Sequence, residues 1–136
     1  MGKFQFDKRL RSRDMVSGAE KSGNRAHLRS LGLLDDDLNK PFIGICNSFN
    51  EMHPGHIHLR ELAGEIKKGV YESGGIPFEF NTIAICDGLT QGNIGMRYVL
   101  PSRDIIADSF ELIAEAQRLD GIVYVCSCDK IVPGML

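Results

Sequence analysis

The feature that most constrains this chain is an alternation of short apolar runs with segments of helical periodicity. The apolar runs cover residues 41–46, 78–85 and 121–126, and each is short enough to form one buried strand. Between them, residues 56–72 and 101–117 place apolar side chains three and four positions apart, as an amphipathic helix requires. This order predicts an α/β fold, a three-layer βαβαβ unit with a parallel sheet and right-handed crossovers.

Both helical segments carry apolar stripes and recognisable ends. In the first segment, Ser73, Gly74 and Gly75 follow the last apolar position, so a glycine is expected to end the helix. Ser102 is the expected N-cap of the second segment, and Asp104 lies in its first turn, where a negative charge is favourable. The side chains expected to face the sheet are Leu59, Leu62, Ile66 and Val70, followed by Ile105, Ile106, Phe110, Ile113, Ala114 and Gln117.

Residues 1–40 differ from the rest of the chain in composition and charge. Residues 1–30 contain eight Lys and Arg against three Asp and Glu, whereas the complete 136-residue chain has a net charge of −2. We therefore expect a basic, irregular N-terminal arm over residues 1–40, with one short helix at residues 24–31, and an α/β domain over residues 41–136. The arm is either a solvated surface or a segment that meets an acidic substrate or partner.

Composition excludes several classes of protein. No run approaches the roughly 18 apolar residues that a membrane span needs, and the first ten residues lack the apolar centre of a signal peptide. The pI of about 6.1 and the lack of a basic patch interleaved with aromatic residues argue against nucleic-acid binding. A cytoplasmic location with reduced thiols is therefore expected, and the four cysteines are not expected to form disulfides.

Reactive side chains follow each of the three apolar runs. The first run ends at Cys46, the second leads into Cys86 and Asp87, and the third leads into residues 128–130, with the sequence CDK. Ligands of an open parallel sheet bind outside the carboxyl ends of its strands, so these groups are expected to share one edge. Thiolates favour soft metals and iron–sulfur clusters, and carboxylates favour magnesium or manganese. Neighbouring Cys and Asp side chains point in different directions, so they would serve two different metal centres.

Each of these residues also has a structural explanation. Cys46 and Cys126 lie within apolar runs, where a cysteine is usually a small buried hydrophobic side chain. A structural and a ligand role carry equal weight for Cys86, whereas Cys128 lies beyond its strand and is expected to be a ligand. Asp87 is followed by a glycine and would suit a simple turn. The histidines at positions 53, 56 and 58 are expected on the surface, at the start of a helix.

Four segments of the sequence resemble the dihydroxy-acid dehydratase and phosphogluconate dehydratase family. They are NSFNEMHPGHIHLRELA, GGIPFEFNTIAICDG, GMRYVLPSRDIIADS and CDKIVPGML, and the resemblance extends over almost the whole chain from about residue 11. The sequences PFEFNTIAICDG and GMRYVLPSR are most similar to those of the dihydroxy-acid dehydratases of branched-chain amino acid synthesis. The resemblance implies a hydro-lyase that converts a 2,3-dihydroxy acid, such as 2,3-dihydroxy-3-methylbutanoate in valine and isoleucine synthesis, to a 2-oxo acid.

The resemblance also implies two cofactors and the residues that hold them. An iron–sulfur cluster, either 2Fe-2S or 4Fe-4S, would be bound through Cys128. A magnesium ion would be held by Asp87, Asp129 and Lys130, the last after carboxylation of its amine, because an ammonium group cannot coordinate a cation. The expected partners are a small-molecule dihydroxy-acid substrate and further copies of the chain in a homodimer or larger oligomer, with no nucleic acid and no membrane.

Two features depart from the family pattern. Some relatives carry a cluster-binding cysteine where this chain has Gly55, so either Cys46 or Cys86 compensates or the cluster type differs. Gln91 and Asn93 replace the methionine and histidine that are commoner in this loop, which leaves a sugar-acid dehydratase acting on gluconate or its phosphate as an alternative. A non-catalytic, metal-binding α/β module is the alternative outside the enzymes.

Members of the family are several times longer than this chain. Residues 41–136 therefore resemble the start of a longer, metal-binding dehydratase domain, and the chain is expected to be an N-terminal fragment. The proposed serine base of the family, a further cluster cysteine and more magnesium contacts belong to segments beyond the position of Leu136. No catalytic residue is therefore expected within the chain, and we expect no dehydratase activity from it alone.

Overall fold

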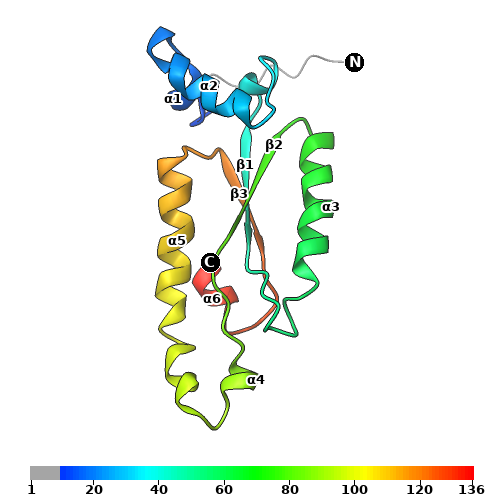
Figure 1. Ribbon diagram of the computed structural model, residues 1–136, viewed down its shortest axis with the longest axis vertical. Helices are drawn as coiled ribbons and strands as arrows, with labels where there is room; N and C mark the ends of the chain where they lie inside the picture. Colours follow the sequence, from blue (N-terminus) through cyan, green and yellow to red (C-terminus); the bar gives the residue numbers. More distant parts are fainter. Residues whose placement is uncertain (1–9) are drawn as a thin grey trace.

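Three parallel strands form the centre of the molecule (Figure 1). The computed structural model describes residues 10–136, in which β1 (Phe42–Asn47) lies between β2 (Ile76–Asn81) and β3 (Gly121–Val125). Both neighbours run parallel to β1, and a helix connects each strand to the next. The predicted α/β class and the order strand, helix, strand, helix, strand are therefore confirmed.

Helices occupy the two connections, the region before β1 and the segment after β3. The α-helices are α1 (Arg13–Val16), α2 (Ser22–Ser30), α3 (Leu59–Glu72), α4 (Asp87–Thr90), α5 (Ser102–Ala116) and α6 (Val132–Met135). The 3₁₀ helices are η1 (Ala19–Lys21), η2 (Asp37–Asn39) and η3 (Ile94–Tyr98). None of the helices within residues 10–136 is both long and apolar enough to cross a membrane.

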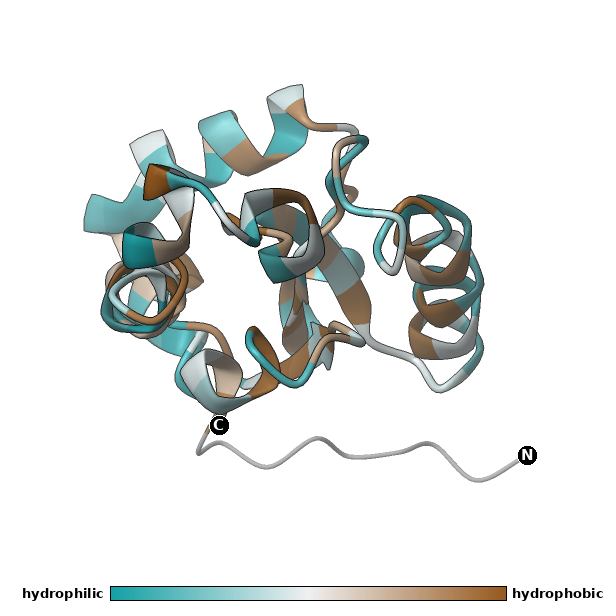
Figure 2. Ribbon diagram, turned by 90° about the horizontal axis from the view of Figure 1, so that it is seen from below, coloured by the Kyte–Doolittle hydropathy of each residue, from teal (hydrophilic) through white to brown (hydrophobic). Residues whose placement is uncertain are grey.

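The helices α3 and α5 cover opposite faces of the sheet, as Figures 1 and 2 show. Successive side chains of β1 point to opposite faces, so Ile45 packs with Leu59 and Ala63 of α3, whereas Cys46 packs with Ile106 on the α5 side. These side chains are almost completely buried. The predicted three-layer arrangement is therefore present, with an apolar core on each face of the sheet.

The second strand differs most from its predicted bounds. An apolar run at residues 78–85 predicts the strand there, but β2 begins at Ile76 and ends at Asn81. Asn81 lies opposite Asn47, the last residue of β1, and the amide of Thr82 donates to the Asn47 carbonyl at 2.9 Å. Because β1 offers no partner beyond this point, residues 82–86 continue as irregular chain.

The predicted end of α3 is confirmed, whereas the predicted N-cap of α5 is wrong. Gly74, with φ +84°, follows α3 as expected, since a left-handed backbone favours glycine there. The expected N-cap role of Ser102 is wrong, because Pro101 occupies that position. The Ser102 hydroxyl instead donates to the carbonyl of Val99 at 2.7 Å, which ties α5 back to the preceding turn.

Three side chains assigned to the apolar stripes are exposed instead, and Gln117 at the end of the second stripe is one of them. Leu62 is 45% exposed and Ile105 is 57% exposed. Ala63 is completely buried in place of Leu62, and Ile106, which the stripe correctly includes, is completely buried beside the exposed Ile105. Sequence spacing identifies the stripe, but a helix turns by about 100° per residue, so an error of one position moves a side chain out of the core.

Residues 10–40 pack against the end of the sheet at which the strands begin (Figure 1). Val16 and Leu38 are buried in a cluster with Phe42, and Arg11 forms an ion pair with Glu115 at 2.6 Å. The short helix expected at residues 24–31 is present as α2. The described part of the predicted arm is thus attached to the domain, and the remainder of that arm, residues 1–9, lies outside the described residues.

Candidate metal centre

The three carboxyl ends of the strands meet at one edge of the sheet, at the opposite end from residues 10–40 (Figure 1). Asp87 begins α4 after the irregular chain that follows β2, and residues 128–130 form a turn between β3 and α6. The side chains of Asp87 and Lys130 meet across this edge, with 3.6 Å between Asp87 Oδ2 and Lys130 Nζ. The expectation that groups from different strands converge here is therefore confirmed for the second and third strands.

Lys130 connects the two carboxylates of this edge. Its Nζ lies 2.6 Å from Asp129 Oδ2 in addition to its contact with Asp87. The hydrogen bond that Lys130 donates to Asp129 raises the pKa of Lys130, and the same bond lowers the pKa of Asp129. Asp129 is exposed, whereas the side chains of Asp87 and Lys130 are 33% and 28% exposed. The ammonium group thus occupies the place that a cation shared by both carboxylates would take.

Cys128 points its sulfur toward the same turn. The backbone N–H of Lys130 donates to Cys128 Sγ at 3.4 Å, and the thiol lies 3.6 Å from Asp129 Oδ1. An N–H donor at sulfur stabilises negative charge on that atom, as metal coordination by a thiolate requires. The turn therefore places a sulfur donor and an oxygen donor on neighbouring residues.

Arg103, on α5, fixes the backbone of this turn from outside. Its Nε donates to the carbonyl of Lys130 at 2.9 Å, and its Nη2 lies 3.4 Å from the carbonyl of Asp129. Sequence reasoning did not assign a role to Arg103, because the contact joins positions that are 27 residues apart in the chain. The residue is a structural support of the site rather than one of its donors.

The expectation that the histidines lie on the surface is wrong for two of the three. His56 is completely buried and His53 is 4% exposed, and only His58 is exposed. The two buried rings stack with their centroids 3.9 Å apart. Burial lowers the pKa of both, although the backbone of Ser48 partly opposes the effect at His56.

A sequence signal for the buried His56 does exist. His56 precedes Leu59 by three positions and Ala63 by seven, which is the spacing of the apolar face of α3. Its Nε2 accepts a hydrogen bond from the backbone N–H of Cys128 at 3.2 Å. The ring therefore touches the turn that carries the candidate ligands, which no local pattern predicts.

The other cysteines occupy different environments. Cys46 is completely buried within the core on the α5 side, where burial raises its pKa to about 12 and the nearby thiol of Cys126 adds to the effect. Burial also raises the pKa of Cys126. Cys86 is partly exposed and precedes α4 directly. A neutral thiol is thus favoured at Cys46, while Cys86 and Cys128 are the more accessible sulfurs of this edge.

The donor chemistry of this edge fits a hard cation when Lys130 supplies oxygen. Within residues 10–136, no three His, Cys, Asp or Glu side chains are grouped so that they could hold a metal ion together. Asp87 and Asp129 provide two carboxylates, and a carbamate on Lys130 would provide a third oxygen donor beside them. Cys128 provides one thiolate for a cluster, whose other ligands would come from further cysteines.

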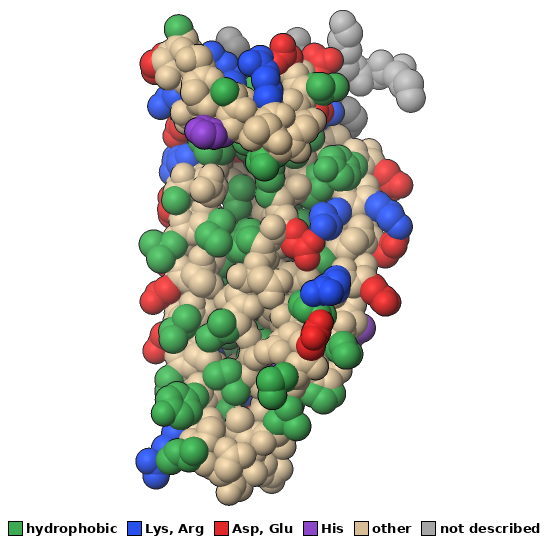
Figure 3. All heavy atoms as spheres, viewed as in Figure 1, with side chains coloured by type: hydrophobic (Ala, Val, Ile, Leu, Met, Phe, Trp, Pro, Cys, Tyr) green, Lys and Arg blue, Asp and Glu red, His purple; other side chains and the backbone are tan. Residues whose placement is uncertain are grey.

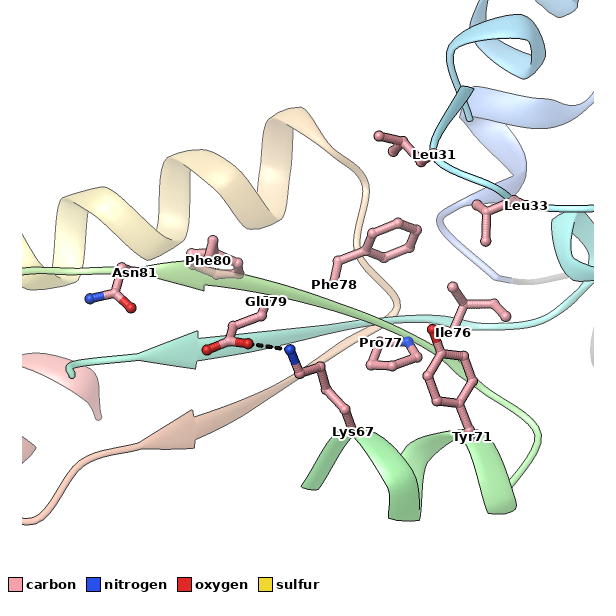
Figure 4. A pocket seen from close by; sticks show the side chains of 10 residues that line it. All are labelled: Leu31, Leu33, Lys67, Tyr71, Ile76, Pro77, Phe78, Glu79, Phe80 and Asn81. Carbon is pink, nitrogen blue, oxygen red and sulfur yellow. Dashed lines mark hydrogen bonds and ion pairs between the residues drawn. The ribbon is translucent and has the colours of Figure 1, made fainter. Parts of the chain in front are cut away.

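A separate hollow of the described surface lies away from this edge. A cavity of about 750 Å³ follows the outer edge of β2, and Figure 4 shows its lining. Lys67 of α3 reaches across it to form an ion pair with Glu79 of β2. None of the predicted site residues lines this cavity. Its lining is Leu31, Leu33, Lys67, Tyr71, Ile76, Pro77, Phe78, Glu79, Phe80 and Asn81.

The loop that follows Asp87 exposes apolar side chains. Figure 3 shows such side chains gathered at the end of the molecule where α4 and η3 lie. Each of them is at least 44% exposed: Leu89, Ile94, Met96, Tyr98 and Leu100. Large apolar side chains that gather on a surface are typical of a region covered by another part of a protein or by a partner.

Comparisons with known proteins identify the family of this chain. The family model described as dihydroxy-acid/6-phosphogluconate dehydratase N-terminal matches residues 40–136. Proteins named dihydroxy-acid dehydratase from Methanospirillum hungatei, Methanococcus aeolicus and Pyrococcus abyssi are 54%, 56% and 55% identical over 92–93% of the chain. The match covers 23% of each of these relatives, so the chain spans about a quarter of their length. The chain belongs to the dihydroxy-acid/6-phosphogluconate dehydratase N-terminal family.

Proposed function

We propose that this chain is the metal-binding N-terminal portion of a hydro-lyase that removes water from a 2,3-dihydroxy carboxylic acid and yields a 2-oxo acid. The observation that carries the proposal is the meeting of Asp87, Asp129 and Lys130 beside Cys128 at one edge of the sheet. The names and the sequence identity of the relatives support it independently. In this proposal Asp87, Asp129 and a carboxylated Lys130 hold Mg²⁺, and Cys128 binds an iron–sulfur cluster.

The residues of the edge have separate tasks in such a reaction. When bound, the cluster and Mg²⁺ supply Lewis acidity to a departing hydroxyl and to the oxygens of the substrate. Asp87 and Asp129 place two carboxylates at this edge of the sheet. An anionic substrate would be repelled by them unless a bound cation neutralises their charge. The Lys130 backbone N–H stabilises charge on Cys128 Sγ. The proton acceptor for C2 is expected in segments that the longer relatives contain.

Lys130 can become a ligand only by losing its positive charge. Carboxylation joins its neutral amine to CO₂ through a new N–C bond and releases one proton. Pairing with Asp129 and Asp87 favours the ammonium form, so we expect carboxylation to require a divalent cation that replaces the ammonium between these carboxylates. Mass spectrometry of the intact protein under native conditions measures the addition of CO₂ directly.

A cation-binding experiment tests the proposed magnesium site. We expect Mg²⁺ or Mn²⁺, added with bicarbonate, to bind the wild-type protein and to bind Asp87→Asn and Asp129→Asn at least about 10-fold more weakly, because each variant removes one ligand. The matched control is Asp36→Asn, since Asp36 is exposed and lies outside the edge. Equal affinity for wild type and the Asp129→Asn variant would remove the basis of the proposal.

The substrate needs a test of its own. We favour 2,3-dihydroxy-3-methylbutanoate of valine and isoleucine synthesis, because the relatives are named dihydroxy-acid dehydratases. The second candidate is a sugar acid such as 6-phosphogluconate, which the name of the family model includes. Gln91 and Asn93 in the exposed loop after Asp87 are the observation that favours it.

A chimera separates these substrates. Residues 40–136 would replace the matching segment of the Methanococcus aeolicus relative, and the intact relative and the chimera with Asp129→Asn serve as controls. Turnover of the dihydroxy acid is expected, and preference for the sugar acid would support the second candidate. The 136-residue chain alone, supplied with iron, sulfide and magnesium, is expected to show no turnover. An inactive chimera beside an active relative would favour a non-catalytic module.

We also propose that the protein assembles as a homodimer or a larger oligomer. The exposed apolar side chains after Asp87 support a surface that a second copy covers. Light scattering during gel filtration measures the molar mass. A monomer at micromolar concentration would contradict this part of the proposal.

A further inference from the structure

We propose that His56 is a positioning residue whose neutral imidazole fixes the turn of Cys128 and so holds an iron–sulfur cluster in place. The proposal rests on the cluster role given to Cys128 above. It concerns a residue that touches neither cluster nor substrate and acts only through the backbone of Cys128. The observations that carry it are the partners of the two ring nitrogens, which lie on different segments of the chain.

The partners of the ring define one tautomer. His56 Nδ1 lies 2.8 Å from the carbonyl oxygen of Ser48, which can only accept, so Nδ1 carries the proton. His56 Nε2 lies 3.2 Å from the backbone nitrogen of Cys128, which can only donate, so Nε2 carries none. The geometry therefore requires a neutral ring with its single proton on Nδ1. Only this form satisfies both neighbours.

The Ser48 end of this contact is itself fixed. The Ser48 hydroxyl donates to the carbonyl of Val125 at 2.9 Å, and the Ser48 amide donates to the same carbonyl at 3.0 Å. The hydroxyl oxygen also lies 3.1 Å from His56 Nδ1 and is free to accept from it. Val125 is the last residue of β3, so the ring is anchored to the ends of both β1 and β3.

A second bond joins the same two turns. The Ser127 hydroxyl donates to the carbonyl of Gly55 at 2.5 Å, beside the bond from Cys128 to His56. The adjacent positions 55 and 56 thus accept from the adjacent positions 127 and 128. Two neighbouring contacts of this kind restrict rotation of the peptide groups between β3 and α6. A single contact would leave these peptide groups free to rotate.

The orientation of the Cys128 peptide decides where its sulfur points. With its own N–H directed to His56, Cys128 has its Sγ opposite the Lys130 N–H at 3.4 Å. Without the acceptor at position 56, this N–H would be left unpaired in a half-buried site, and rotation toward water would relieve it. Such a rotation moves the thiol away from the Lys130 amide, so the sulfur loses both its direction and its N–H donor.

The stacked neighbour preserves this state of the ring. His53 lies against His56 with 3.9 Å between ring centroids and shields that face from water. No hydrogen-bond partner is present for either ring nitrogen of His53 within the described residues. His53 therefore contributes shielding, and the directional contacts belong to His56.

The tautomer is measured first, on the wild-type protein. With ¹⁵N-labelled histidine, the nitrogen chemical shifts of His56 are expected to show a proton on Nδ1 and none on Nε2. Hydrogen exchange of the Cys128 amide is expected to be slow compared with the exposed amide of Ser127. A proton on Nε2 would overturn the proposal without any variant being made, because that nitrogen then cannot accept.

Three variants separate positioning from simple packing. His56→Gln places an amide oxygen near the position of Nε2 and keeps an acceptor for Cys128, whereas His56→Asn reaches only as far as Nδ1 and keeps none. His58→Gln is the matched control, because His58 is exposed in the same segment. Iron and sulfide per chain and the visible circular dichroism of the cluster are measured after reconstitution of the chimera with the Methanococcus aeolicus relative, which supplies the remaining cluster ligands.

We expect His56→Asn to retain the cluster about 10-fold less well and to exchange its Cys128 amide faster. His56→Gln and His58→Gln are expected to match the wild type. Equal retention by the Asn and Gln variants would overturn the proposal, since a packing role alone does not distinguish an acceptor at one position from its absence. Should both His56 variants fail to fold, the wild-type tautomer and exchange measurements decide the question.

The same experiments distinguish a failure of the proposed cluster role from a failure of the His56 inference. If the chimera of residues 40–136 with the Methanococcus aeolicus relative binds no iron and sulfide while the intact relative does, the cluster role of Cys128 falls, and with it the second half of this inference. The nitrogen shifts and the Cys128 exchange rates would then still show whether His56 fixes the turn. A cluster that forms in wild type and survives equally in all variants overturns the inference alone.

Discussion

Asp120 accepts a hydrogen bond from the backbone amide of Phe42, with 2.7 Å between its Oδ2 and the amide nitrogen. Its second oxygen accepts from the amide of Ser12 at 3.0 Å. One carboxylate at the start of β3 therefore holds both the start of β1 and the segment that precedes it. Residues 10–40 owe their place on the domain to this contact as well as to their apolar side chains.

Substitution of Asp120 tests this attachment. Asp120→Ala leaves the buried Phe42 amide without its acceptor, so we expect a loss of about 1–3 kcal/mol in the free energy of unfolding. Limited proteolysis should also cut within residues 10–40 sooner than in wild type. Asp120→Asn keeps one acceptor oxygen, so its free energy of unfolding should lie between those of wild type and Asp120→Ala. Unchanged stability of Asp120→Ala in urea titrations would contradict the assignment.

Two glycine substitutions are expected to change stability in opposite directions. A Cβ on Gly134 in α6 would meet the backbone of Arg103 at 3.0 Å, so Gly134→Ala should cost about 1–3 kcal/mol through overpacking. A Cβ on Gly64 in α3 meets nothing within 4 Å, so Gly64→Ala should gain about 0.5–1 kcal/mol, because alanine restricts the unfolded chain. Thermal unfolding of both variants measures the difference, and a stabilising Gly134→Ala would be inconsistent with this packing of α6 on α5.

The ion pair between Glu79 and Lys67 should make stability depend on pH in the acid range. Burial alone would raise the pKa of Glu79, but the hydrogen bonds from Lys67 and Asn47 outweigh it and hold that pKa below its ordinary value of 4.5. A lowered pKa in the folded state stabilises the protein above pH 4.5, and this contribution disappears as the pH falls through the folded-state pKa.

We therefore expect Glu79→Gln to cost about 1 kcal/mol at pH 7 and to become equal to wild type at low pH. Urea titrations at pH 7, 5 and about 3 measure this convergence. Glu65→Gln is the control, because Glu65 pairs with Lys68 on the exposed face of α3 and should have little effect at any of these values. A difference between wild type and Glu79→Gln that grows toward low pH would show that the sign is wrong.

The cysteines should differ in their reaction with alkylating reagents. The thiolate is the reactive form, and burial raises the pKa of Cys46 to about 12 while also excluding the reagent. We expect iodoacetamide at pH 8 to modify Cys128 and Cys86 first and Cys46 only after unfolding. Peptide mass spectrometry locates each modified cysteine. Modification of Cys46 at the rate of Cys128 in the folded protein would contradict the core position of Cys46.

Local patterns in the sequence determined the elements of this fold. The spacing of apolar residues identified β1, α3, α5 and β3, and the strand–helix alternation identified the parallel sheet, because crossover connections allow few other arrangements. The placement of reactive groups after each strand also predicted the meeting of Asp87 and Lys130, since parallel strands end at one edge.

Other features were decided only by tertiary structure. The end of β2 at Asn81 depends on where β1 stops, and the hydrogen bond of His56 depends on the turn of Cys128, which lies 72 positions further along the chain. The attachment of Ser12 depends likewise on Asp120. The periodicity of apolar residues reflects local secondary structure and the face of each element that is buried. A hydrogen bond between distant segments produces no local sequence pattern, because its two partners come close only when the sheet and its covering helices assemble.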